Sequence, residues 1–364
     1  MSKNIKLKDL EEEQEYEIDS NNVPPSDVVA FNELRSCAEL ARLYKTNQLD
    51  IKPDFQRDIV WSKPEQTRFI DSLTKQLPIP SMCISLDSDP NAKSKKRLVI
   101  DGLQRMTSII NFLTDDNWVL SKLPDIDPCL SGKKVSEIKA ESNFLYEIVE
   151  NVSIPITVIR CDYSKPKHND YLFTIFHRLN SGGKRLNNQE IRNCIFNGSF
   201  NTLLKNLALK KESKEFFGNA KRGSNKEQII SKRFSDEEMI LRFFAFNENL
   251  DNYNGRLAVF LSDYMSKNKN SEKNEALYID SLNVIKKMID QPYKIFSKTI
   301  LEGLLYGVSQ NIEVLTNKST DELKELFEKF KKLPEFSSDN LKSSLSDKDK
   351  VKDRLLVSKN CFGQ

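Results

Sequence analysis

An apolar strand pattern that runs directly into a helical pattern is the feature that most constrains this fold. Residues 97–100 (Arg-Leu-Val-Ile) are typical of a buried strand, and Asp101-Gly102 follows them at once. The next residues place apolar side chains on one helical face, at Leu103, Met106, Ile109, Ile110 and Leu113. The segment therefore predicts a strand, a tight turn and a helix, which together form a unit of mixed α/β structure.

Further strand patterns flank this unit. Residues 81–86 and 152–160 are predicted strands, and Pro155 indicates that the second of them is an edge strand or carries a bulge. From about residue 170 onward helical patterns dominate. Among them, Asn187 with Glu190 predicts one helix start, and Ser235 with Glu238 predicts another.

Two helices are also predicted before residue 80. Ser36, with Glu39 three residues later, predicts the first helix start. The second helix is predicted to open at Pro64 and to be stopped by the prolines at 78 and 80. Its expected apolar stripe is Phe69, Ile70, Leu73 and Leu77.

The length of 364 residues suggests two domains. We predict an α+β fold: an acidic arm in residues 1–33, a small mixed α/β domain in residues 34–200, and an all-helical domain in residues 201–364. Residues 211–233 are expected to be a basic connector, because residues 205–233 hold nine Lys or Arg against three Asp or Glu. Such a stretch is typical either of a surface that faces a polyanion or of a solvated helical face.

The composition excludes several classes of protein. The only histidines are His168 and His177, which makes a His-Asn-His nuclease, a His-rich zinc site or a two-histidine metalloprotease hard to build. The six cysteines lie far apart and form no CxxC pair. No apolar run approaches the roughly 18–20 residues of a membrane span, and the first residues are polar. We therefore expect a cytoplasmic protein with no membrane partner.

The turn at residues 101–105 carries the chemistry. The start of a helix presents unpaired backbone N–H groups and attracts anions. Gly102 would let a phosphate approach the backbone, and Arg105 would fork onto its oxygens. Gln104 and Thr107 add neutral hydrogen-bonding groups, and Asp101 would hold a metal ion or orient water. An alternative explains the same residues structurally: Asp101 caps the helix, Gln104 closes the capping box, and Arg105 pairs with a nearby acid.

Two other segments contain candidate ligand-binding residues. Phe55-Gln56-Arg57, followed by Trp61, ends an extended stretch, where side chains can point into a cleft; alternatively the aromatic residues are core anchors. Residues 176–184 form a helix end with Arg178, Asn180, Gly-Gly and Lys184. That end would present cations and backbone N–H groups to a ligand, or it is a plain helix C-cap.

Together these segments resemble the N-terminal domain of GmrSD-type restriction proteins, a domain related to the ParB and sulfiredoxin nucleotide-binding fold. The matching pieces are Phe55-Gln56-Arg57, Trp61, Ile100 to Arg105, Arg178-Leu179-Asn180, and Leu186 to Ile191. The resemblance covers about residues 34–200. One departure is Leu103, where the family usually has Gln; its place on the apolar stripe with Met106 and Ile110 favours a core role.

The resemblance implies a module that binds, and hydrolyses or senses, GTP or a related triphosphate with Mg²⁺ in antiviral defence. It implies catalytic roles for Asp101, Gln104 and Arg105, with Asp101 as the metal ligand. The nucleotide-binding residues that we predict are Gln56, Arg57, Gly102, Arg105, Thr107, Arg178, Asn180 and Lys184. Many members of the family also carry a His-Asn-His nuclease domain, which this chain lacks by its histidine content. A separate nuclease or effector subunit would then supply DNA cutting.

Two other functions stay open at this point. In the first, the chain is a non-catalytic, ParB-like DNA-binding regulatory module. Its DNA-binding residues would then be Lys210, Lys211, Lys214, Lys221 and Arg222. In the second, it is a metal-dependent nuclease that nicks DNA, with Asp101 as a metal ligand.

Overall fold

The computed structural model describes residues 24–51, 61–89, 97–179, 187–196, 198–218, 226–289, 297–337, 340–341 and 345–364. The chain divides into two compact units, one spanning Asn21–Leu186 and one that includes Asn187–Gln364. We call them the sheet unit and the helical unit. This arrangement, a small mixed sheet domain followed by helices, confirms the predicted α+β fold class. In the described part of the chain, the search for a helix that could span a membrane found none.

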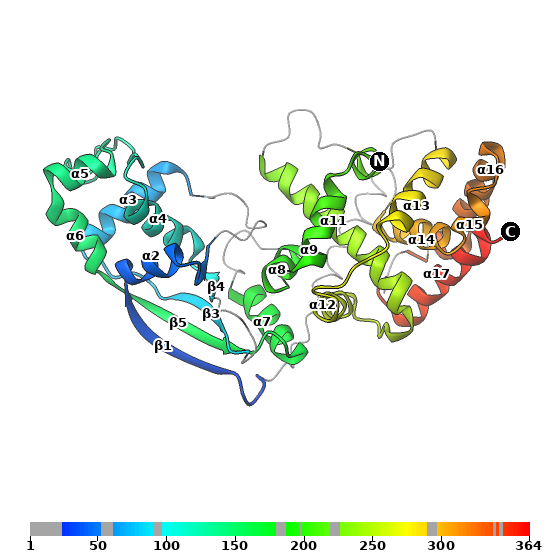
Figure 1. The fold of residues 1–364 in the computed structure, drawn as a ribbon, viewed down its shortest axis with the longest axis horizontal. Helices are drawn as coiled ribbons and strands as arrows, with labels where there is room; N and C mark the ends of the chain where they lie inside the picture. The colour runs from blue at the N-terminus through cyan, green and yellow to red at the C-terminus, as the bar shows by residue number, and fades with distance from the viewer. Residues whose placement is uncertain are drawn as a thin grey trace. The chain divides into compact units, whose positions relative to one another are not determined.

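The sheet unit contains one mixed five-stranded sheet in the order β1-β5-β3-β4-β2 (Figure 1). Its strands are β1 (Val29–Ser36), β2 (Leu49–Asp50), β3 (Met82–Asp87), β4 (Arg97–Asp101) and β5 (Ser153–Cys161). The pairs β1–β5 and β3–β4 are antiparallel, whereas β3–β5 and β2–β4 are parallel. The three predicted strands are confirmed as β3, β4 and β5. The sequence did not predict β1, part of which lies in the expected acidic arm.

Pro155 predicts an edge strand or a bulge, and the structure has neither, because β5 pairs in unbroken register with β1 and β3. Strand β5 lies inside the sheet, between β1 and β3. The parallel pairing with β3 begins only at Ile156, which lies opposite Met82, so Pro155 is paired with Leu34 of β1 alone. A proline has no N–H to donate, and it is tolerated at this position because β5 is paired there on one side only.

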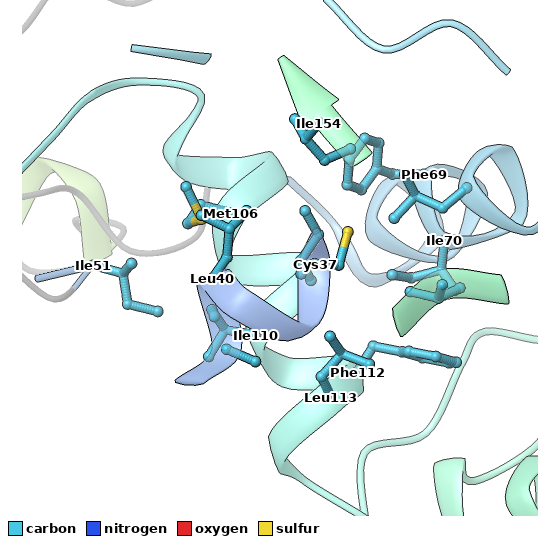
Figure 2. Close-up of a cluster of buried hydrophobic side chains, with 14 of the residues drawn as sticks. Cys37, Leu40, Ile51, Phe69, Ile70, Met106, Ile110, Phe112, Leu113 and Ile154 are labelled. Carbon is cyan, nitrogen blue, oxygen red and sulfur yellow. The ribbon is translucent and has the colours of Figure 1, made fainter. Parts of the chain in front are cut away.

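Helices α2 (Cys37–Lys45), α3 (Lys63–Thr74), α4 (Leu103–Thr114), α5 (Val135–Glu141) and α6 (Asn143–Asn151) share one buried apolar cluster with the sheet. Figure 2 shows Leu40, Phe69, Met106 and Ile154 meeting in this core from α2, α3, α4 and β5. The predicted starts of α2 and α3 are confirmed: Ser36 caps α2, and Ser62 with Glu65 forms a capping box ahead of Pro64.

The opposite face of the sheet is covered by α7 (Pro166–Leu179), which contacts β4 and β5. Val99 belongs to the first core, so the alternation of side chains along β4 places Leu98 and Ile100 on the second face. Both are buried as well. Strand β4, whose end carries Asp101, is therefore held between two apolar layers.

Helix α3 ends earlier than the sequence predicted. Its last residue is Thr74, and Gln76 follows in the left-handed region at φ 52°. The Leu77 N–H donates to the Ser72 carbonyl at 3.0 Å, which closes the helix end in the manner of a Schellman motif. Leu77 was expected on the buried stripe, but it lies outside the helix and is 51% exposed.

The helical unit is built from α8 onward. Its helices are α8 (Asn188–Ile195), α9 (Ser199–Leu209), α10 (Lys211–Phe217), α11 (Lys226–Asn249), α12 (Leu257–Lys267), α13 (Glu275–Met288), α14 (Lys298–Ser309), α15 (Ile312–Leu315), α16 (Thr320–Lys331) and α17 (Lys348–Phe362). Short 3-10 turns lie at Leu250–Asn252 and Pro334–Phe336. Asn187 and Glu190 form the predicted capping box of α8.

Two predictions in the helical unit are wrong. Residues 211–217 and 226–233, expected in a connector, are helical. Ser235 and Glu238 do not start a helix, because α11 runs through them without a break. The Glu238 carboxylate is buried instead and pairs with Arg242 at 2.7 Å and Arg192 at 3.3 Å.

Candidate functional site

The predicted turn forms as a strand, a left-handed glycine and a helix. The cap residue of α4 is Gly102, at φ 87° and ψ 18°, and no side chain of the described residues hydrogen-bonds to the cap. The alternative in which Asp101 caps the helix is therefore wrong. The first intrahelical bond runs from the Met106 N–H to the Gly102 carbonyl at 2.9 Å. The backbone N–H groups of the first turn are thus left without a side-chain cap.

The glycine at position 102 is explained by packing. A Cβ built on Gly102 would lie 2.5 Å from Cγ of Met82 on β3, far inside van der Waals contact. Its positive φ also disfavours any other residue. The side of Gly102 on which a Cβ would lie is therefore occupied by Met82. The approach of a phosphate is not needed to explain the glycine.

Arg105 holds the chain that enters β3. Its guanidinium donates to the main-chain carbonyls of Pro80 and of Ser81, the latter at 3.3 Å, and to the Asp101 carboxylate at 3.1 Å. The Arg105 side chain is only 16% exposed, and this burial lowers its pKa from the usual value while Asp101 raises it. The guanidinium is thus directed at protein groups, whereas the sequence suggested an open cleft. This agrees with the alternative in which Arg105 pairs with a nearby acid.

Gln104 joins the starts of α3 and α4. Its side-chain oxygen accepts a hydrogen bond from the main-chain N–H of Trp61 at 3.2 Å. The main-chain carbonyl of Trp61 accepts one from Nε2–H of Gln66 at 3.0 Å. The Trp61 ring packs edge-on against Phe69, with 5.5 Å between the ring centres. Trp61 is therefore a core anchor on its apolar side, as one interpretation of the sequence expected.

Gln66 is a polar residue that sequence reasoning missed. It is 4% exposed, and its Oε1 has no hydrogen-bond partner among the described residues. A buried acceptor without a donor is costly, about 1–3 kcal/mol. The available signal was its spacing, since Gln66 continues the stripe of Phe69, Ile70 and Leu73 at helical intervals. A polar side chain in an apolar stripe marks a position worth testing.

Asp101 is the accessible acid of the turn, with 40% of its side chain exposed. It lies opposite Cys83 in the β3–β4 pair. Burial, and secondarily the Asp101 charge, raises the pKa of the Cys83 thiol to about 12, so this cysteine stays protonated at neutral pH. One exposed carboxylate suits Mg²⁺ when phosphates and water supply the other ligands. No group of three or more metal-binding side chains occurs in the described ranges.

Arg178 lies in the last turn of α7, and its side chain is exposed. Burial raises the pKa of Tyr171 on the same helix, and the Arg178 charge lowers it. Thr107, in the second turn of α4, is half-buried.

Part of the predicted site lies outside the described residues. This applies to the predicted nucleotide-binding residues Gln56, Arg57, Asn180 and Lys184, and to the predicted DNA-binding residues Lys221 and Arg222. The described part brings Asp101, Gly102, Gln104, Arg105 and Thr107 together on one strand end and one helix start. Arg178 lies apart from them in the last turn of α7, a helix that contacts β4.

The predicted DNA-binding lysines in the described part are exposed but surrounded by acids. Lys210 pairs with Glu275 at 3.1 Å, and Lys211 pairs with Glu215 at 3.8 Å. Glu215 also binds Lys286, which lowers the pKa of its carboxyl. Lys214 is exposed on the same helix, α10. The positive field of this helix is therefore smaller than the lysine count suggests.

Comparison with known proteins supports the resemblance. The family model described as GmrSD restriction endonuclease, N-terminal domain, matches residues 39–197. The matched stretch contains β3, β4, α4 and α7, and it is similar to the N-terminal domain of these restriction endonucleases. Neither the curated proteins nor the solved structures gave a significant match.

Proposed function

We propose that this chain is a module of a restriction system that acts against foreign DNA, and that its GmrSD-type domain binds and hydrolyses a nucleoside triphosphate at the start of α4. The family of residues 39–197 supports the first part of the proposal. The observation that carries the second part is the uncapped first turn of α4 beside the exposed carboxylate of Asp101. Nuclease activity would come from a separate subunit, and DNA would be the final substrate.

The first turn of α4 suits a polyphosphate on electrostatic grounds. Its backbone N–H groups carry the positive end of the helix dipole, and no side chain in the described part of the chain caps them. Arg105 can present a forked donor to phosphate oxygens once it leaves the carbonyls of Pro80 and Ser81. Binding would therefore exchange protein acceptors for phosphate acceptors at this one guanidinium.

The catalytic contributions we propose are positioning and charge stabilisation, which dominate phosphoryl transfer. Asp101 would hold Mg²⁺, which supplies positive charge for the phosphates when bound. Gln104 would orient water after releasing the Trp61 N–H. Leu103, where the family usually has Gln, packs against the apolar core. Because residue 103 faces the core, the proposed hydrolysis would not need its side chain to contact the nucleotide.

The test is a thermal-shift screen of the full chain against the four ribonucleoside triphosphates with Mg²⁺, followed by a phosphate-release assay. A ligand that binds the folded state raises the melting temperature. Asp101→Asn keeps an acceptor for Arg105 and should abolish phosphate release, and Arg105→Gln should abolish the ligand-induced shift. Arg68→Gln is the matched control, because this arginine of α3 is exposed and pairs with Asp125 at 2.8 Å. A screen in which no triphosphate changes the melting temperature would refute the proposal.

A second candidate is the ParB-like DNA-binding module, favoured by the exposed lysines of α10. Lys214 is the best single test because the structure shows Lys210 and Lys211 in ion pairs with glutamates. Binding of duplex DNA that falls steeply with salt, is weakened by Lys214→Glu and is indifferent to triphosphate and to Arg105→Gln would favour this function. The nicking-nuclease alternative has weaker support, because Asp101 is not part of a metal-binding cluster among the described residues.

A further inference from the structure

A groove of about 780 Å³ lies in the sheet unit, away from the turn at Asp101-Gly102. One wall is the connection from α3 to β3, with Leu77 and Ile79, and the other is α6, with Phe144 and Ile148. The start of β5, at Pro155, forms its end. Helices α3 and α6 lie side by side, so the groove follows the junction of elements that are packed together (Figure 1).

The groove presents large apolar side chains to solvent. Phe144 is 60% exposed and Leu77 is 51% exposed. Leu34, which pairs with Pro155 across β1 and β5, is 71% exposed and extends the apolar surface beyond the groove. These exposed apolar side chains lie beside polar groups of the same groove, such as Glu147 and Asn151, so a partner that covers the groove must be amphipathic.

The spacing of residues on α6 resembles that of a binding face. Phe144, Glu147, Ile148 and Asn151 all line the groove, and their intervals of three and four residues place them on one side of the helix. Buried Leu145 and Val149 face the core instead. Helix α6 therefore has one face packed in the protein and another face turned to the groove.

The charge of the groove selects its partner. Glu147 is the one charged residue among the described residues that line the groove. Helix α6 also contains Glu150 and has neither Lys nor Arg. Residues 1–33 of this chain hold nine Asp or Glu against three Lys, so they are electrostatically unsuited to the groove. The complementary partner is apolar on one side and carries Lys or Arg beside it.

We infer that this groove docks an amphipathic, basic helix of a partner protein. Apolar side chains of such a helix, three or four residues apart, would cover Leu77 and Phe144, and a flanking cation would pair with Glu147. A helix in an apolar groove is an established mode of protein recognition. The inference does not depend on nucleotide binding at Asp101 and Arg105.

The experiment uses the full chain and a fluorescent synthetic helix of Leu and Lys, about 18 residues long so that it can become helical. Fluorescence anisotropy should show saturable binding. Phe144→Glu and Glu147→Lys should each weaken it by about tenfold or more. Val119→Glu is the matched control, because Val119 is an apolar residue of the sheet unit, 40% exposed, outside the groove lining. A Leu and Glu helix of the same length should bind the natural chain at least about tenfold more weakly.

Three results would overturn the inference. The first is equal binding of the Leu and Lys helix by the natural chain and by Phe144→Glu. The second is a loss of peptide binding in Val119→Glu as large as the loss in Phe144→Glu. The third is a chain that dimerises, loses the dimer in Phe144→Glu and ignores the peptide, since the groove would then belong to a second copy. Thermal melts of each variant check folding; the exposure of Phe144 predicts an unchanged melting temperature.

Discussion

The two units of this protein place their charged side chains in opposite ways. In the sheet unit the core is apolar, and Arg105 and Asp101 lie at its border with partial exposure. In the helical unit Glu238 is buried between two arginines: Arg192 at 3.3 Å and Arg242 at 2.7 Å. Arg242 in turn binds Glu302 at 3.2 Å. Charge is therefore available to a ligand in one unit and enclosed in the other.

The difference teaches which charges can change partners. Burial raises the pKa of Glu238, but the charges of Lys298, Arg242 and Arg192 lower it by more than burial raises it. The pKa therefore lies well below its usual value, and the carboxyl stays ionised. Removing one member of such a network leaves the others charged and unpaired away from water. Arg105 instead binds two main-chain carbonyls and a carboxylate that is open to solvent. The proposed ligand site therefore lies in the sheet unit, and the buried ion pairs of Glu238 stabilise the helical unit.

The largest effect is expected from Glu238→Ala. It leaves buried arginines without their shared carboxylate and should destabilise the helical unit by about 3–5 kcal/mol. Denaturant unfolding can separate the units, because both tryptophans, Trp61 and Trp118, belong to the sheet unit. The midpoint of the unfolding transition followed by far-ultraviolet circular dichroism should move to a lower denaturant concentration. The midpoint followed by tryptophan fluorescence should not change.

The matched control is Glu215→Ala, which removes an exposed carboxylate of the same unit and should change neither transition. Equal shifts in circular dichroism for Glu238→Ala and Glu215→Ala would contradict the comparison between the units.

The second effect is expected from Gly102→Ala. The added Cβ collides with Met82, and its φ of 87° disfavours alanine, so the sheet unit should lose about 2–4 kcal/mol. The tryptophan fluorescence transition should now move, whereas the transition of the helical unit does not.

A double variant separates the two causes. Gly102→Ala with Met82→Ala should lose less stability than the sum of the single variants, because the collision is gone and only the backbone strain remains. Strict additivity would show that packing against Met82 is not the reason for the glycine.

The smallest effect concerns acid. Asp27 binds Lys165 and accepts from Nε2–H of buried His168 at 2.8 Å, while Nδ1 of His168 accepts the Asp162 N–H at 3.0 Å. The hydrogen bonds from Lys165 and His168 lower the pKa of Asp27 from 3.8 to about 2. A depressed folded pKa means that the stabilisation is complete above the unfolded pKa and is lost as the pH falls from about 4 toward 2.

Melting temperatures of the natural chain and of Asp27→Asn should therefore differ near neutral pH and converge as the pH is lowered through that window. A constant difference down to the lower end of the window would mean that the Asp27 charge does not support this contact.

The sequence predicted the local features of the fold well. Pro64 predicted the start of α3, and Ser36 with Glu39 predicted the start of α2, from signals between close neighbours; the structure contains both starts. Strand β1 escaped detection because it lies mostly exposed at the sheet edge and lacks a buried, alternating pattern. Leu77 kept helical spacing, but the left-handed turn at Gln76 removes it from the helix. Spacing alone cannot show where the backbone leaves a helix.

The candidate site was predictable in its position and less so in its contacts. The turn at Asp101-Gly102 followed from adjacent residues and from the family resemblance. The contacts of Arg105 with Pro80 and Ser81 join residues more than twenty positions apart, and no local pattern reports them. For the same reason Glu238 was taken as a capping residue, although its partner Arg192 lies 46 positions away.

The grip of Arg105 on the chain before β3 has a thermodynamic corollary. The carbonyls that it binds belong to Pro80 and Ser81, directly after Ile79 in the wall of the apolar groove. An anion that draws the guanidinium away breaks these two hydrogen bonds of Arg105. The affinity for the anion is therefore reduced by the free energy of the two bonds. Such a coupling is reciprocal. If a docked helix favours the state in which Arg105 holds Pro80 and Ser81, it lowers the affinity for the anion by the same factor by which the anion lowers the affinity for the helix. If both proposed ligands bind, this one side chain would therefore make the two occupancies depend on each other.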